Sequence, residues 1–161
     1  MSSMGAGPSR GAGDAEAGLP DLVFVVPAAN ENRWSDLLAT LIATDPDPVA
    51  RLLGVPVDEV RREEVVGGQV GRRSDRLDLL LLHEGRQTAA IEVKLLSDLG
   101  PQQLARYEVA FPDAGSHRVL HLGGLPVNLR EAPAWSPLTW EDVLAAYAGS
   151  VNAWVATTAR A

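Results

Sequence analysis

The stretch RLDLLLLHEGRQTAAIEVKLL, residues 76–96, decides the fold. Its first part, 76–83, is a near-continuous apolar run, which is typical of a central strand covered on both faces. The glycine within 84–86 predicts a turn, and 88–96 predicts the returning strand. We therefore expect a buried antiparallel hairpin at the heart of the domain.

Two charged residues, Glu92 and Lys94, interrupt the apolar return strand. Side chains alternate between the two faces of a strand, so both should point one way while their apolar neighbours point the other. Lys94 is the only lysine in the chain, and every other basic side chain that is not histidine is an arginine. A Glu-x-Lys pair is usually a solvent-facing ion pair, but charges in an apolar setting are costly unless paired or bound to metal. The setting favours a functional site.

The position of Asp78, near the start of the first strand, depends on the turn. A three-residue loop at 84–86 would pair His83 with Gln87 and put Asp78 directly opposite Glu92. A two-residue loop would shift the register by one residue and send Asp78 to the wrong face. We expect the three-residue loop or an equivalent bulge. With a different register, Asp75 would be the alternative acid.

If Asp78 does face Glu92, two carboxylates and an ammonium meet at one end of the hairpin. Two carboxylates about 5 Å apart repel and raise each other's pKa unless a cation lies between them. Mg²⁺ prefers oxygen ligands, binds one or two carboxylates and keeps waters for a phosphate substrate. An ammonium is a compact charge whose pKa shifts readily, whereas a guanidinium is bulkier and stays protonated. This difference explains a lone lysine at position 94.

The rest of the chain predicts a mixed α/β domain. Residues 1–18 are rich in Gly, Ala and Ser and predict a disordered tail, and 19–161 predict a single domain. Helices are expected at 30–45 with Asn30 as N-cap, at 100–111, and at 139–148 with Thr139 as N-cap, and a short helical turn at 49–54. Further strands are expected at 63–68 and 117–124, with a proline-bearing loop at 126–137. Residues 22–26 fit either a short strand or a lead into the first helix.

Composition narrows the function classes. The chain has no cysteine, so it has neither disulfides nor a thiolate metal site. No apolar run reaches membrane-spanning length and no secretory signal pattern is present, so we expect a cytoplasmic protein without membrane contact. The three histidines, His83, His117 and His121, lack ligand-like spacing with acids.

The net charge and the local distribution of charge point to different conclusions about nucleic-acid binding. The net charge of −7 argues against nonspecific coating of nucleic acid. Five arginines nevertheless cluster between positions 61 and 76: Arg61, Arg62, Arg72, Arg73 and Arg76. They fit either a solvated hairpin edge or a local phosphate-contacting patch.

The residues Asp78 and Glu92-x-Lys94, on adjacent strands after a helix that begins with Glu31, resemble the PD-(D/E)XK nuclease superfamily. Gln103 and Tyr107 resemble the Q-x-x-x-Y signature that many members carry. The family's nominal proline is replaced by Leu77, a common departure. The resemblance implies a restriction-endonuclease-like αβββαβ core, with a four-stranded mixed sheet flanked by helices and an extra C-terminal helix.

The resemblance also implies roles for individual residues. Asp78 and Glu92 would bind Mg²⁺ (or Mn²⁺), with the backbone carbonyl of Val93 as a third ligand. Glu31 would act through water or a second ion. Lys94 would position or deprotonate the attacking water and stabilise charge on the phosphorus.

The remaining signature residues are expected around this centre. Gln103 would lie near the lysine and the phosphate, as the fourth catalytic residue. Tyr107 would pack behind the site or touch the nucleic acid, together with Arg72, Arg73 and Arg76. Helix packing alone is the other reading of Gln103 and Tyr107.

We therefore expect a Mg²⁺-dependent nuclease that cleaves DNA, with RNA left open as a substrate. Double-strand cleavage by so small a domain would favour a homodimer or an accessory protein partner. The alternative is a non-catalytic nuclease-fold subunit that binds nucleic acid or a partner protein.

Overall fold

The computed structural model describes residues 30–66, 75–95, 99, 102–122 and 128–160. These residues form five helices and five strands. In chain order they are α1 (Glu31–Thr44), α2 (Asp47–Leu53), β1 (Glu59–Val66), β2 (Asp75–His83), β3 (Arg86–Lys94), α3 (Gln103–Ala110), β4 (Ser116–His121), β5 (Trp135–Thr139), α4 (Trp140–Ala148) and α5 (Ala153–Arg160). The expected tail at 1–18 and the segment 22–26 lie outside the described residues.

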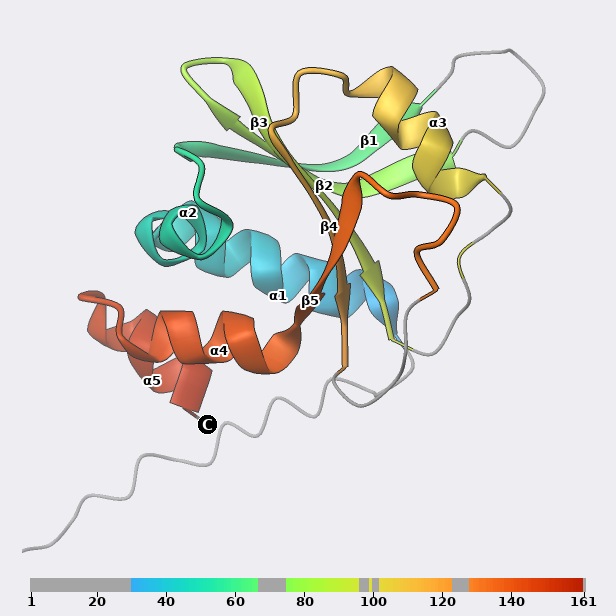
Figure 1. The fold of residues 1–161 in the computed structure, drawn as a ribbon. Coiled ribbons are helices and arrows are strands. Elements are labelled where there is room, and N and C mark those ends of the chain that lie inside the picture. Colours follow the sequence, from blue (N-terminus) through green and yellow to red (C-terminus); the bar gives the residue numbers. More distant parts are fainter. Residues whose placement is uncertain (1–29, 67–74, 96–98, 100–101, 123–127, 161) are drawn as a thin grey trace, which may run out of the picture.

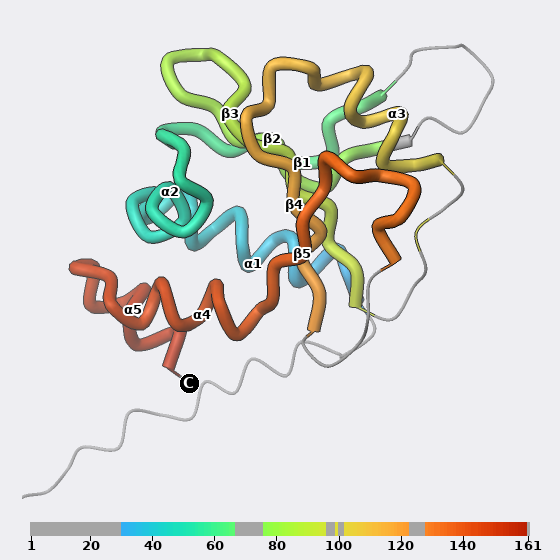
Figure 2. Tube along the Cα trace, viewed as in Figure 1, coloured from blue at the N-terminus to red at the C-terminus, as the bar shows by residue number. Residues whose placement is uncertain are grey.

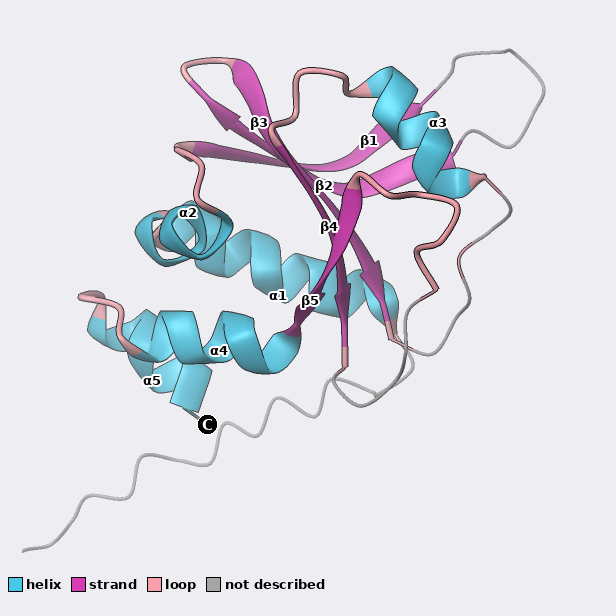
Figure 3. Ribbon diagram, viewed as in Figure 1, coloured by secondary structure: helices cyan, strands magenta, loops and turns pink. Residues whose placement is uncertain are grey.

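The five strands form one mixed sheet in the order β1-β2-β3-β4-β5. The first three strands are antiparallel neighbours, while β3, β4 and β5 run parallel to one another, as the trace in Figure 2 shows. Helices α1, α2, α4 and α5 cover one face of the sheet and α3 covers the other (Figure 1). The chain is therefore an α/β domain with helices on both faces of the sheet (Figure 3).

The expectation of a four-stranded sheet is wrong, because β5 adds a fifth strand. This strand lies partly within the expected loop at 126–137 and contains Pro137, which cannot donate to a strand ladder. Proline is tolerated in an edge strand, and β5 is at the edge of the sheet, paired only with β4. The last helix, α5, was not predicted either.

The central hairpin reaches the expected alignment by the bulge rather than by the loop. His83 pairs with Arg86 across the two-residue turn Glu84–Gly85, and both turn residues have positive φ (50° and 73°), as a tight hairpin turn requires. The register then shifts between Leu81 and Leu82, and Thr88 is the extra residue. Its hydroxyl donates to the carbonyl of Leu81 at 3.3 Å.

The two faces of β3 take part in two separate cores. Ala89, Ile91, Val93 and Leu95 belong to the core beneath α1, α2 and α4, as the alternation of the strand predicted. Ala90 belongs to the core beneath α3, together with Leu104 and Tyr107 of that helix. The face of β3 that carries Glu92 is therefore the face that meets α3.

The helix caps expected from the sequence are confirmed. The side chain of Asn30 accepts from the backbone N–H of Arg33 at 3.3 Å and begins α1. Thr139 and Asp142 form a reciprocal capping box at the start of α4. Within the described ranges, none of the helices combines the length and the apolar character needed to cross a bilayer.

Candidate active site at the end of the central hairpin

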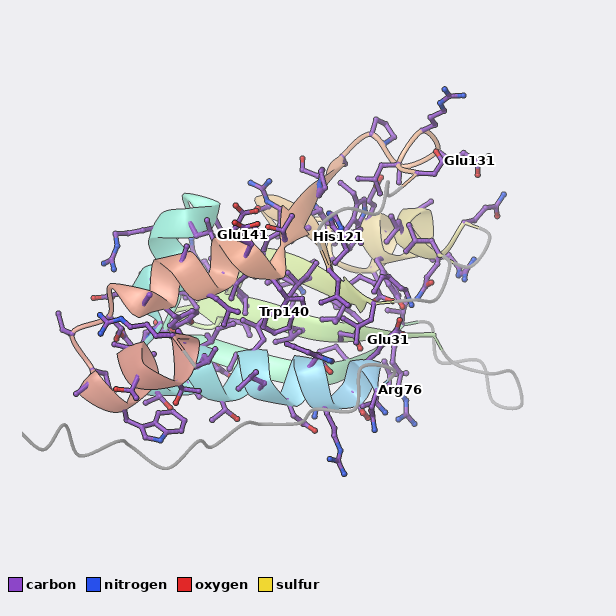
Figure 4. All side chains as sticks on the ribbon, turned by 90° about the horizontal axis from the view of Figure 1, so that it is seen from below. Glu31, Arg76, His121, Glu131, Trp140 and Glu141 are labelled. Carbon is purple, nitrogen blue, oxygen red and sulfur yellow. The ribbon has the colours of Figure 1, made fainter. Side chains whose placement is uncertain are left out.

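Lys94 joins carboxylates from two separate elements. Its Nζ lies 3.1 Å from Oε1 of Glu92 on the same strand and 3.8 Å from Oε2 of Glu31 in the first turn of α1. The other oxygen of Glu31 accepts from the backbone N–H of Leu95 at 3.0 Å. The start of α1 is therefore tied to the end of β3, and Figure 4 shows Glu31 and Arg76 at the same end of the molecule.

Asp78 reaches the same place from β2. The paired ladder of β2 and β3 ends at Leu79–Ile91, and continuing that register by one step sets Asp78 opposite Glu92. At this level Oδ2 of Asp78 accepts from the backbone N–H of Val93 at 2.8 Å. A side chain thus replaces the regular strand ladder where the charged residues begin.

Glu92 is the most deeply buried charged side chain of the cluster. The residue is 2% exposed, and its Oε2 is buried without a hydrogen-bond partner among the described residues. Burial and the nearby carboxylate of Asp78 raise the pKa of Glu92 to about 8, although Lys94 and the backbone N–H of Asp78 favour the charged form. An unpartnered, buried carboxylate oxygen is costly and calls for a proton or a cation.

The neighbouring groups are shifted as well. Burial raises the pKa of Asp78, and the bond from Val93 and the charge of Lys94 offset this only in part. Burial works against the charge on Lys94, but the carboxylates of Glu92, Glu31 and Asp78 outweigh it, so the pKa of Lys94 is raised. Perturbed titrating groups that share one place are a common mark of functional sites.

Gln103 and Tyr107 connect the cluster to α3. The amide nitrogen of Gln103 donates to Oε1 of Glu92 and to the hydroxyl oxygen of Tyr107, both at 2.8 Å. The hydroxyl of Tyr107 donates to the backbone carbonyl of Arg76 at 2.7 Å. Tyr107 is fully buried, so of its two expected positions it takes the one behind the site.

Only some arginines of the expected patch lie among the residues that the structure describes. Arg72 and Arg73 lie outside the described residues. Arg76 is exposed at the start of β2, and its guanidinium lies 3.0 Å from Oε2 of Glu63. Arg61 pairs with Glu59 at 2.6 Å. Acids of the same chain therefore partly neutralise the described arginines of β1 and β2.

The donor set fits a Mg²⁺ ion bound through two carboxylates. Across the described ranges, no three His, Cys, Asp or Glu side chains form a group that could hold a metal ion, and Glu31 is engaged by Leu95 and Lys94. Asp78 and Glu92 remain as neighbouring carboxylates, and Glu92 has a buried oxygen without a partner. Mg²⁺ needs only one or two carboxylates, since waters and substrate oxygens complete its octahedron.

The structure places His121 and Arg62 near the cluster, although from sequence His121 had no site role and Arg62 was placed only in the candidate phosphate-contacting patch. His121 pairs with Lys94 in the parallel register of β3 and β4, which only the return of the chain through α3 could reveal. Arg62 on β1 contacts α1, although 26 or more residues separate it from its partners there. Neither the pairing of His121 with Lys94 nor the contact of Arg62 with α1 could be predicted from the spacing of nearby residues in the sequence.

Comparison with known proteins adds little. No family model matches the chain, and no curated protein matches it. Among solved structures it is similar to one described as "Crystal Structure of Protein of Unknown Function AF1548", with 12% sequence identity and a TM-score of 0.42. The match covers 70% of this chain and 59% of the other, so the chain spans less than two thirds of that protein. So weak a likeness carries no weight for function, which leaves the chemistry of the cluster as the ground for a proposal.

Proposed function

We propose that the chain is a Mg²⁺-dependent phosphodiesterase that cleaves nucleic acid, with DNA as the expected substrate. The observation that carries the proposal is Glu92: a buried carboxylate with one unpartnered oxygen, next to Asp78 and 3.1 Å from the only lysine. A core position seldom keeps such a group without paired charges or a cation. A divalent cation held beside a cationic lysine is a setting that suits a phosphate ester.

Each residue then has a defined task. Asp78 and Glu92 would hold Mg²⁺, with the carbonyl of Val93 as a further oxygen ligand. When bound, the ion supplies Lewis acidity and neutralises charge on the phosphate. Lys94, whose raised pKa keeps it an ammonium, would orient the attacking water and stabilise negative charge that develops on the phosphoryl oxygens. Gln103 fixes the Glu92 carboxylate through its 2.8 Å hydrogen bond.

The order of the elements supports a PD-(D/E)XK reading of this site. With the short helix α2 set aside, the order α1, β1, β2, β3, α3, β4 matches the αβββαβ order of that superfamily. Asp78, Glu92 and Lys94 occupy adjacent strands, and α3 presents Gln103 to Glu92. Helix α2, the fifth strand and the C-terminal helices α4 and α5 are additions to this order.

Asp78→Asn is expected to reduce cleavage of linear DNA in Mg²⁺ by about 10³-fold, which corresponds to several kcal/mol of transition-state stabilisation. The amide still accepts the bond from Val93, so the fold should survive, but it is a poor ligand for a hard cation. A gel-based cleavage assay in Mg²⁺, in Mn²⁺ and in a chelator measures the effect. Asp113→Asn, on an exposed loop, is the matched control.

A wild-type protein that cleaves neither DNA nor RNA in any of these conditions would contradict the proposal. The second candidate function, a non-catalytic binding subunit, would then be favoured. The series of hydrogen bonds from Glu92 through Gln103 and Tyr107 to the carbonyl of Arg76 is compatible with a purely structural polar network. Calorimetry separates the two functions, because a binding subunit would fold normally and show no heat of Mn²⁺ binding.

A further inference from the structure

Arg62 of β1 holds three groups of α1 at once. Its Nη2 donates to the hydroxyl of Ser35 at 2.9 Å and to the carbonyl of Asn32 at 3.4 Å. Its Nη1 pairs with the carboxylate of Asp36. We call these three contacts of Arg62 with Asn32, Ser35 and Asp36 the clamp. Ser35 is fully buried, so the clamp is partly shielded from water. A guanidinium is a rigid fork that can bind several acceptors in one geometry.

The clamp lies on the first turns of α1, where the apolar contact is that of the half-buried Trp34, which packs against the core with its ring centroid 4.7 Å from that of Trp140. The buried apolar residues of the helix are Leu38, Leu41 and Ile42, all in its later turns. The first turn, which carries Glu31, contributes no fully buried side chain. The acceptors of Arg62 begin directly after Glu31 in the chain, so they lie in the first two turns.

We propose that Arg62 is a positioning residue: by fixing the first turns of α1 against β1, it places the Glu31 carboxylate at the end of β3. This inference rests on the proposed function, because it gives Glu31 its place in the same site. In the sheet Arg62 pairs with Leu79, on the face that α1 covers. Arg62 thus acts on the cluster through the helix that carries Glu31.

The positive charge of Arg62 also favours the charged form of Asp78. It opposes the rise that burial imposes on the pKa of Asp78, although burial is the larger influence. Substituting lysine would keep this charge but lose the fork. Arg62→Lys therefore separates the effect of charge from the effect of position.

The backbone N–H of Leu95 reports on the position of Glu31 without any metal, because it donates to Oε1 of Glu31 at 3.0 Å. Amide exchange measured by ¹⁵N NMR should be about tenfold faster at Leu95 in Arg62→Met than in the wild type, as expected for loss of one buried hydrogen bond. Arg62→Lys should show most of this change. Amides at the centre of β2 should keep their protection, whereas a merely structural loss of stability would speed exchange at all of them together.

Arg61→Met is the matched control, since Arg61 lies one residue away, forms an ion pair with Glu59 and is exposed. It should leave Leu95 exchange unchanged. If Arg62→Met does not fold, Asp36→Asn decides the matter, because it removes one exposed partner of the clamp and should speed Leu95 exchange about threefold. A folded Arg62→Met protein, or failing that Asp36→Asn, with wild-type protection at Leu95 overturns the proposal.

A calorimetric titration with Mn²⁺ separates failure of the clamp from failure of the function. Arg62→Met should weaken Mn²⁺ binding about as much as Glu31→Gln, and the double variant should be little worse than either, because one substitution acts through the other. If the losses of Mn²⁺ binding free energy in the two single variants add fully in the double variant, the proposed role of Arg62 is overturned. No Mn²⁺ binding by the wild type contradicts the proposed function, while Leu95 exchange still decides the clamp.

Discussion

Lys94→Met is expected to leave a folded domain that has lost essentially all cleavage, by about 10³-fold or more. Methionine preserves most of the side-chain length and removes only the ammonium. Loss of the charge takes away the group that faces Glu92 and Glu31 at 3.1 and 3.8 Å. Glu92 can become protonated in response, since its pKa is already raised to about 8, so the buried acid is not left charged and alone.

Lys94→Arg sharpens this test. Arginine keeps the positive charge, but its guanidinium is larger and planar, so it does not reproduce the compact ammonium that lies beside Glu92 and Glu31. We expect it to fold and to recover little of the cleavage. Arg51→Met, on the exposed side of α2, is the matched control for loss of one cation. Near-wild-type cleavage by Lys94→Met, measured as initial rates in Mg²⁺, would remove Lys94 from the mechanism.

Glu92→Gln is expected to have opposite effects on cleavage and on stability. It should abolish cleavage, because an amide is a poor Mg²⁺ ligand, and it should stabilise the metal-free protein at pH 8. The pKa of Glu92 is about 8 in the folded protein against an ordinary 4.5. Between these values the folded state binds more protons than the unfolded state, so the free energy of unfolding falls as pH rises through this window.

The size of the effect follows from the size of the shift. A shift of this order corresponds to several kcal/mol across the window as an upper bound, and the raised pKa of Asp78 acts in the same direction. Glutamine has no charge to bury, and its side-chain oxygen can still accept from Gln103. The stability of Glu92→Gln should therefore depend much less on pH.

Urea unfolding at pH 5 and pH 8 in the presence of a chelator measures this difference. Glu141→Gln, an exposed substitution in the first turn of α4, is the control and should follow the wild type closely. Adding Mg²⁺ at pH 8 should stabilise the wild type and not Glu92→Gln, because only the native state offers the site. If the free energy of unfolding of the wild type is constant or rises from pH 5 to pH 8, the pKa of Glu92 is not raised in the folded protein.

The sequence predicted the parts of this structure that local rules control. Apolar runs and alternation identified β2 and β3 and put Glu92 and Lys94 on one face, and caps located the starts of α1 and α4. The alignment of Asp78 with Glu92 was expected from a three-residue loop or an equivalent bulge, and a bulge at Thr88 produces it. Turn and bulge give the same register, so the pattern of apolar residues could not distinguish them.

Other features depend on contacts between distant parts of the chain. Pro137 made β5 look like a loop, because a proline is excluded from inner strands but not from the edge position that topology gives it. The burial of Tyr107 depends on how α3 crosses the sheet. The contact of Arg62 with α1 depends on how that helix lies across β1, a matter of tertiary packing.

A crystal structure of the wild-type protein soaked in Mn²⁺ at pH 8, with the ion located by its anomalous scattering, tests the central claim most directly. We predict one ion held by carboxylate oxygens of both Asp78 and Glu92, at roughly 2.0–2.3 Å for so hard a cation. Lys94 should remain beside it. A structure without an ion at these two residues, with Oε1 of Glu92 still bonded only to Lys94 and Gln103, would contradict the account.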